Sequence, residues 1–463
     1  MLCQNCGNAE ATTHIKRIVN GEASEIHLCY TCAEHLGYAN MFSGFGYNID
    51  NMLQNFFPEF TRALPSVESE CCPVCHTSFA DVIREGHMGC AECYKTFYDK
   101  LRPSLARIHG RATHVGKASG KEQEISDIES LVVKSSTEND VAISTKVTIA
   151  RNVKDINFTP RLSIEEKYDI ADKIDAILDE KLPGKFATTP MNEVGRDLQI
   201  SLAERNLVSP EFVSMAEGRT FITTSDETLS MMVCESDHLK MQAVLPGLSL
   251  DTAYTLVDTL DSILDSEIGF AYDENLGYLT ESPTDIGTAM RASVTLQLPA
   301  LAMRGQIPHL ANTVSKLGLV LTGAYGEADE PLGSLYQLSN QVTLGISEQA
   351  AIDNLKAISL SIVEQERALR LELMNSLKFQ DTLWRSYGTL RNARVLSFAE
   401  FMEALSYVRI GVSAGEIKIP NDELNQLIFT MQPATLNVSF GQSLDRQIRD
   451  VRRAEKVREI FEK

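Results

Sequence analysis

Apolar residues recur along this 463-residue chain with two different periods, and together these periods predict a mixed α+β protein. Residues 140–152 alternate apolar and polar side chains, which is typical of a strand with one buried face. Three later segments carry apolar residues at helical spacing, and the first opens on a capping box formed by Ser163 and Glu166. The helical apolar positions are Ile170, Ile174, Ile177 and Leu178, then Leu256, Val257, Leu260, Ile263 and Leu264, and finally Ile352, Leu355, Ile358 and Ile362.

The segments between these helices are β-branched or apolar runs bounded by Gly and Pro. They lie at 220–236, 277–285, 293–301 and 318–327. Such runs predict strands, so we expect helices around a mainly antiparallel sheet. The third helix begins a long helical tail that contains the only tryptophan, Trp384.

Cysteine use divides the chain, because nine of the ten cysteines precede residue 94. Eight of the nine form four Cys-x2-Cys pairs, which are Cys3 with Cys6, Cys29 with Cys32, Cys72 with Cys75, and Cys90 with Cys93. Such a turn aims two thiolates at one point about 2.3 Å away, and two turns complete a tetrahedral zinc shell. The four pairs therefore predict two structural zinc sites, with a redox dithiol or disulfide staples as the alternatives. Which pairs share an ion stays open.

The same asymmetry predicts three regions. Residues 1–109 form two four-cysteine zinc modules, the Gly/Ser/Lys/Glu-rich stretch 110–136 is a linker, and residues 137–463 form the body. We expect chelation to loosen the first region and to leave the unfolding transition of the body largely intact.

The charge balance excludes some partners. Acidic residues number 63 against 43 basic ones, a net charge of −20, which argues against general affinity for nucleic acid or an anionic membrane. Any phosphate site must then be local. The first residues carry no basic, apolar export signal and no apolar run is long enough to cross a bilayer, so we expect a soluble, cytoplasmic protein.

Several motifs of the body resemble those of the guanidino (phosphagen-type) kinases, and most of all the bacterial protein arginine kinases. The motifs are IARN at 149–152, LPG at 245–247, SPT-x-x-GT at 282–288, RASV at 291–294, YGE at 325–327 and SNQ-x-TLG at 339–345. The stretch from Met1 to about Lys117 is similar to the zinc-binding activator of the same kinases. The resemblance implies an activator and a guanidino-kinase domain joined in one polypeptide, which raises the effective concentration of one at the other.

The resemblance also implies ATP, magnesium, five nucleotide-clamping arginines and two carboxylates that act on the guanidinium. This chain keeps Arg291 as a cofactor-binding residue and Glu327 as a catalytic one. The departures from the family pattern are Lys146, Thr148, Lys240 and Thr322 for arginines, Ser236 for a carboxylate, Ser282 for a reactive cysteine and Asp285 for an asparagine. Lysine lacks the bidentate fork of arginine and threonine lacks the charge as well, so binding of ATP and magnesium is left open.

Near the C-terminus, Arg449, Asp450 and Arg453 match a motif with which protein arginine kinases are thought to bind phosphoarginine. The two arginines lie four residues apart on one helical face, where they can neutralise a phosphate while the aspartate pairs with the guanidinium. The alternative is an ordinary solvated helix with many charge pairs.

Three functions follow from these observations. The first is a catalytically degraded regulator that binds phosphoarginine-bearing proteins or partners of the Clp stress-protease pathway, with a homodimer as a possible state. The second is an active, ATP-dependent protein arginine kinase whose activator is supplied in cis. The third is a zinc-based nucleic-acid-binding module, which the acidic balance disfavours.

Overall fold

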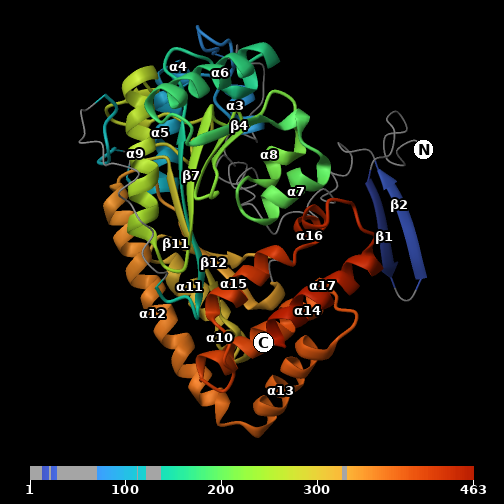
Figure 1. The fold of residues 1–463 in the computed structure, drawn as a ribbon. Coiled ribbons are helices and arrows are strands. Elements are labelled where there is room, and N and C mark those ends of the chain that lie inside the picture. The colour runs from blue at the N-terminus through green and yellow to red at the C-terminus, as the bar shows by residue number, and fades with distance from the viewer. Residues whose placement is uncertain are drawn as a thin grey trace.

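The computed structural model describes residues 13–19, 22–28, 70–111, 113–120, 137–325 and 331–462 (Figure 1). Strands β1 (Thr13–Val19) and β2 (Glu22–Leu28) form an antiparallel hairpin in which Thr13 pairs with Leu28. Four of the predicted zinc ligands, Cys3, Cys6, Cys29 and Cys32, lie outside the described residues, as does Glu327.

An eight-stranded sheet with the order β11-β12-β10-β3-β7-β6-β5-β4 forms the centre of the body. Its strands are β3 (Ala142–Arg151), β4 (Phe186–Pro190), β5 (Thr220–Thr224), β6 (Leu229–Val233), β7 (Leu239–Pro246), β10 (Met290–Gln297), β11 (Leu319–Gly323) and β12 (Leu335–Asn340). Every neighbouring pair is antiparallel, which confirms the predicted sheet type. Short strands β8 (Tyr272–Asp273) and β9 (Gly277–Tyr278) form a separate pair.

Helices surround this sheet, and α9 and α12 pack on it along the three central strands and β12. The helices are α3 (Phe79–Glu85), α4 (Ala91–Thr96), α5 (Tyr98–His109), α6 (Ile164–Lys181), α7 (Arg196–Glu204), α8 (Pro210–Ser214), α9 (Leu250–Ile268), α10 (Pro299–Met303), α11 (Ile307–Ser315), α12 (Glu348–Met374), α13 (Leu377–Asn392), α14 (Phe398–Ser413), α15 (Asn421–Thr430), α16 (Pro433–Ser439) and α17 (Arg446–Phe461). The three predicted helical segments are α6, α9 and the start of α12. The predicted capping box is present, with the Glu166 amide donating to Ser163 Oγ at 3.2 Å.

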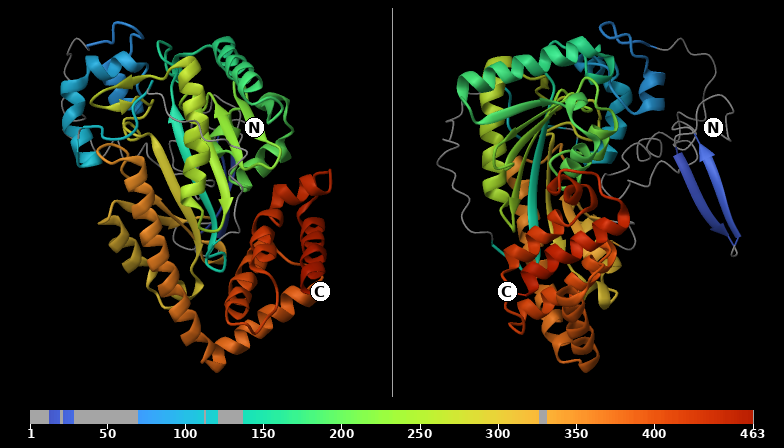
Figure 2. Two further views of the ribbon diagram at one scale, coloured as in Figure 1. Left: turned by 60° about the vertical axis from the view of Figure 1, so that its left-hand side comes forward. Right: turned by 45° about the vertical axis from the view of Figure 1, so that its right-hand side comes forward.

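Helices α13 to α17 form a helical lobe, which Figure 2 shows at the far end of α12. Its apolar core also includes Ile143 of β3, Ala300 of α10 and Leu335 of β12. Buried arginines join this lobe to the start of β3. Arg409 donates to the carbonyl oxygens of Asn139 and Asp140 at 3.0 Å each, and Arg370 donates to the same Asp140 carbonyl at 3.0 Å. The orientation of the lobe is therefore fixed by charge-assisted hydrogen bonds to backbone.

The described zinc module, residues 70–109, does not have a separate core. Its buried residues join one apolar cluster with Phe158, Leu279, Ile286 and Leu344 of the body. Residues 113–120, which we expected in the linker, also pack on the body, where Lys117 donates to Asp258. The shared cluster therefore predicts coupled unfolding of module and body in place of the independent behaviour expected from sequence.

A buried polar joint positions the loops at the end of β3. Asn152 Oδ1 accepts from the amide of His238 at 2.9 Å, while Asn152 Nδ2 donates to Asp237 Oδ1 at 2.7 Å. The His238 ring accepts at Nδ1 from the Val153 amide at 3.0 Å and donates from Nε2 to the Asn157 carbonyl at 2.7 Å. Both ring nitrogens of the neutral imidazole are thus satisfied.

The His238 ring predicts a loss of stability in acid. Burial lowers the pKa of His238 to about 4, so between about pH 6.5 and pH 4 the unfolded chain binds a proton that the folded chain does not. The free energy of unfolding should fall by up to about 3 kcal/mol as the pH falls through this window. Urea denaturation of the parent and His238→Gln at pH 7 and pH 4.5 measures this contribution, and an equal pH dependence in both proteins would contradict it.

Candidate active site and metal centre

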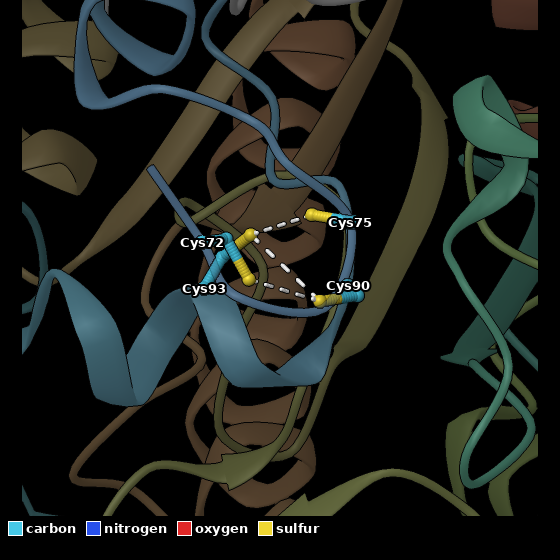
Figure 3. A group of neighbouring side chains, drawn as sticks. All are labelled: Cys72, Cys75, Cys90 and Cys93. Carbon is cyan, nitrogen blue, oxygen red and sulfur yellow. Dashed lines mark hydrogen bonds between the residues drawn. The ribbon is translucent and has the colours of Figure 1, made fainter. Parts of the chain in front are cut away.

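Four buried cysteines of the zinc module form a site with the size of a zinc tetrahedron. Cys72 and Cys75 belong to a tight turn after the first bridge of the module, whereas Cys90 and Cys93 begin α4. The Sγ distances are 3.6 Å for Cys72 to Cys90, 3.3 Å for Cys75 to Cys93 and 3.9 Å for Cys90 to Cys93. Zn–S bonds of about 2.3 Å place tetrahedral sulfurs about 3.8 Å apart, so the group fits zinc (Figure 3).

Mutual contact of the sulfurs favours a bound cation. The hydrogen bond from Cys93 is the main reason why the pKa of Cys90 is lowered to about 5, and the same contact together with burial raises the pKa of Cys93. The site therefore holds one thiolate readily but requires a positive ion to hold four. Zinc bound there would cross-link the turn and the helix. Cys71 is exposed and does not belong to this group.

The zinc module lies against the loop formed by residues 279–285, which carries the SPT motif. The module makes three hydrogen bonds to backbone oxygens of this loop: Tyr94 Oη to Thr280 at 2.8 Å, the Met88 amide to Glu281 at 2.9 Å, and His109 Nε2 to Pro283 at 3.1 Å. Burial lowers the pKa of His109 to about 4, so its ring is neutral and can donate from Nε2. A folded module thus fixes the backbone of the loop at three points.

Arg291, the retained arginine, is paired within the protein. Its Nε and Nη2 atoms donate to Asp285 Oδ1 at 2.9 and 2.6 Å, and Nη1 donates to the carbonyl oxygens of Asn340 and Gln341 at 3.1 and 2.8 Å. Asp285 stands where the family pattern has an uncharged asparagine. Its carboxylate therefore occupies the guanidinium that the resemblance assigns to a nucleotide phosphate.

Lys240, the second expected cation, forms an ion pair with Glu235. Although burial opposes the charged form of Glu235, the Lys240 ammonium holds the pKa of this carboxyl below its ordinary value, and Ser209 Oγ also donates to it.

Ser236, where a carboxylate was expected, lies beside Glu235 with its Oγ 3.4 Å from Glu235 Oε2. Burial raises the pKa of Asp237 to about 6, and its Oδ1 accepts from the Glu281 amide at 2.7 Å. Both acidic neighbours of Ser236 are thus engaged internally.

The other departures lie on the same part of the sheet or beside it. Lys146 lies on β3, makes no ion pair among the described residues, and has its pKa lowered by burial. Thr148 pairs directly with Arg291 in the register of β3 and β10, and Thr322 lies on β11. Ser282 Oγ is 2.8 Å from Thr284 Oγ1, so it belongs to a small hydroxyl cluster. Lys146 is the one sheet cation of the predicted clamp that stays without a carboxylate partner in the part of the chain that is described.

The C-terminal motif divides into two parts on α17. Arg453 is 1% exposed and donates to the carbonyl oxygens of Met431 and Leu396 and to Asp450 Oδ1, at 2.8, 2.9 and 2.5 Å. Arg449 is partly buried, and its Nε has no hydrogen-bond partner. Arg453 and Asp450 therefore contribute to the packing of the lobe, a role that the sequence did not indicate, and the phosphoarginine site stays a prediction. The Nη1 atom of Arg449 lies 3.5 Å from the Leu444 carbonyl oxygen.

Sequence reasoning missed the contacts that place the zinc module. Tyr94, Met88 and His109 carry no local motif, because their partners are backbone oxygens of the 279–285 loop, which lie 174 to 193 residues away in the sequence. The acidic spacing of Asp258 and Asp261 on α9 is a signal that could have indicated a basic partner.

Within the described residues, no helix combines the length and the apolar character that a membrane crossing requires.

Three family models match this chain. Residues 70–116 match the McsA central zinc-finger domain, residues 167–369 match the C-terminal catalytic domain of ATP:guanido phosphotransferases, and residues 376–463 match the protein-arginine kinase McsB C-terminal domain. The order of the three matches agrees with the fusion inferred from sequence.

Curated relatives and solved structures agree with these matches. The chain is 40% identical over 328 residues to the protein-arginine kinase of Caldanaerobacter subterraneus subsp. tengcongensis, covering 69% of this chain and 96% of the relative. It is 38% identical over 327 residues to the protein-arginine kinase of Clostridium acetobutylicum, covering 70% and 96%.

Two solved structures show the same fold. The duplicated taurocyamine kinase from Schistosoma mansoni superposes with a TM-score of 0.55 at 22% identity, covering 68% of this chain and 46% of that chain. A lombricine kinase superposes with a TM-score of 0.51 at 20% identity, covering 62% and 81%. The fold is thus that of the guanidino kinases, and the zinc-finger match accounts for the four-cysteine group. On the strength of its long match to the curated relatives, this chain belongs to the protein-arginine kinase family and carries an McsA-type zinc-finger domain in the same polypeptide.

Proposed function

We propose that this chain is a regulatory member of the family, with greatly slowed phosphoryl transfer, which binds phosphoarginine-bearing proteins or components of the Clp stress-protease pathway. The observation that carries the proposal is the ion pair between Asp285 and Arg291. A nucleotide clamp needs cations whose charge is free to meet phosphate oxygens, and this pair neutralises the only arginine of the clamp that the chain retains.

Further features support the same conclusion. Lys240 is paired with Glu235, and Thr148 and Thr322 bring no charge to the sheet. Each missing electrostatic contact of this kind typically reduces the rate by about 10² to 10³, although such losses do not add within one site. The competing proposal is an active kinase, and the observation in its favour is Lys146, which has no acidic partner among the described residues and can meet a phosphate.

A kinase assay tests the proposal directly. With ATP, magnesium and an arginine-rich protein, the parent chain should form acid-labile phosphoarginine at least about 100-fold more slowly than the Caldanaerobacter kinase. Asp285→Asn should free Arg291 and raise the affinity for magnesium-ATP roughly ten- to hundredfold in calorimetry, because a charge-assisted hydrogen bond to phosphate then becomes available.

The matched control is Asp251→Asn, which removes an exposed carboxylate paired with Lys356 away from the site. It changes the net charge by the same amount and should leave nucleotide affinity unchanged. Robust turnover by the parent, abolished by Glu327→Gln, would establish the active kinase instead.

Phosphoarginine binding is expected to depend on Arg449. Free phosphoarginine at about 100 times its Kd should stabilise the parent by about 2.7 kcal/mol, measured as a rise in melting temperature. Arg449→Ala should abolish the rise, because its partly buried guanidinium is the one in the motif with an unpartnered nitrogen. Arg446→Ala, an exposed position on the same helix, is the control. A shift that survives in Arg449→Ala would exclude this residue as the ligand.

Zinc removal should destabilise more than the module. Because the module and the body share one apolar cluster, chelation or Cys90→Ser should remove support worth about 2 kcal/mol from the body and lower its melting temperature by roughly 3 °C. Cys71→Ser, outside the four-sulfur group, should leave the transition unchanged. Scanning calorimetry measures the transition. If the body unfolds at an unchanged temperature and the module unfolds in a separate transition, the two are independent domains and the prediction is wrong.

A further inference from the structure

We propose that residues 113–120 are a docking latch, with Lys117 as the anchor, and that a cluster of carboxylates on α9 and at the start of α12 is the receptor that keeps the zinc module on the 279–285 loop. The occupant of this acidic cluster is this segment of the same chain. The inference concerns how the module is held and is independent of whether the kinase site is active.

Lys117 has the contacts of a specific anchor. Its ammonium donates to Asp258 Oδ1, Asp261 Oδ2 and Ser262 Oγ, each at 2.8 Å. An ammonium has three N–H donors, so this coordination is complete. The side chain is only 7% exposed, and lysine is rarely buried to this extent unless it is paired. A solvated linker does not place a lysine in this way.

The backbone of the latch is held as well. The Lys117 amide donates to both carboxylate oxygens of Glu348 at 3.1 Å, and the Gly120 amide donates to Asp265 Oδ2 at 2.8 Å. Gly116 passes so close to α12 that a Cβ atom there would lie 2.7 Å from Glu348 Oε1. The segment therefore follows the surface at several successive residues, which is the behaviour of a bound peptide.

The electrostatics of the acidic cluster favour a basic occupant. Its carboxylates are Asp258, Asp261, Asp265 and Glu348. The body supplies one buried guanidinium, Arg151, whose Nε lies 2.8 Å from Asp261 Oδ1. Without the latch the body would hold three surplus negative charges in a partly buried place, which is unfavourable. Lys117 and the two amides compensate for part of this charge.

The latch and the loop contacts act on the same module from two sides. The latch follows directly after α5, whose last residue, His109, donates to the Pro283 carbonyl. Between these two attachments lies a cavity of about 610 Å³, lined by His109, Arg111 and Val115 from the module side and by Asn340 and Ala350 from the body. Contact between module and body is thus incomplete here, and a second attachment at Lys117 limits how far the module can move from the loop.

Chemical labelling of the intact chain tests the anchor without a mutation. In competitive acetylation of lysines, followed by mass spectrometry, Lys117 should react at least tenfold more slowly than Lys95, which is 66% exposed on the same module. Asp258→Asn should raise the reactivity of Lys117 severalfold and leave that of Lys95 unchanged. Equal reactivity of the two lysines in the parent would overturn the proposal.

Release of the module tests the function of the anchor. A protease site placed within residues 121–136 of the full chain allows the N-terminal fragment to be cut free after folding. We expect Lys117→Met to raise the Kd between the two fragments at least tenfold over the parent, whereas Lys95→Met has no effect. If Lys117→Met retains the fragment as tightly as Lys95→Met, the latch does not hold the module and the proposal fails.

Discussion

The proposed function depends on the ion pair between Asp285 and Arg291, because this pair engages the guanidinium that the family pattern assigns to the nucleotide. The pair is partly buried, where an opposite charge at 2.6 Å is a stronger competitor than it would be in water. On the proposed function, a triphosphate would have to displace Asp285 before Arg291 could bind it, and the displaced carboxylate would then repel the ligand. The carboxylate at position 285 thus neutralises a cation and also adds a negative charge near the site.

The same loop connects this pair to the zinc module. Residues 280, 281 and 283 present their carbonyl oxygens to the module, and residue 285 presents its carboxylate to Arg291. Backbone that is held at three points within four residues cannot relax independently of the module. We therefore expect a change at the four-cysteine site to reach the surroundings of Arg291 through this one short loop.

Local patterns predicted the elements well and remote contacts poorly. The alternation at 140–152 and the Ser163 capping box correspond to β3 and the start of α6, since both depend on residues close in sequence. The spacing of the cysteines predicted zinc ligands but not their pairing, which needs the fold. The sequence could not indicate that Arg453 donates to the carbonyl oxygens of residues 396 and 431, because these residues lie in other elements of the fold. Lys117 was placed in a linker for the same reason, since its acidic partners lie more than 140 residues away.

Fusion changes what controls the contact between module and body. For separate chains, the fraction in complex depends on the concentration of the activator, but a module joined by a short linker experiences an effective concentration of about millimolar at all times. Docking of the module on the body then depends on two features of the chain itself. These are the four-cysteine site, which supports the fold of the module, and the ion pairs of Lys117 with Asp258 and Asp261. A buried lysine between two aspartates is strongly favourable only while every partner is present, because losing one leaves an uncompensated charge. The latch is therefore closer to an all-or-none attachment than to a graded one, and a change that loosens either Lys117 or the zinc module should also reach the loop beside Arg291.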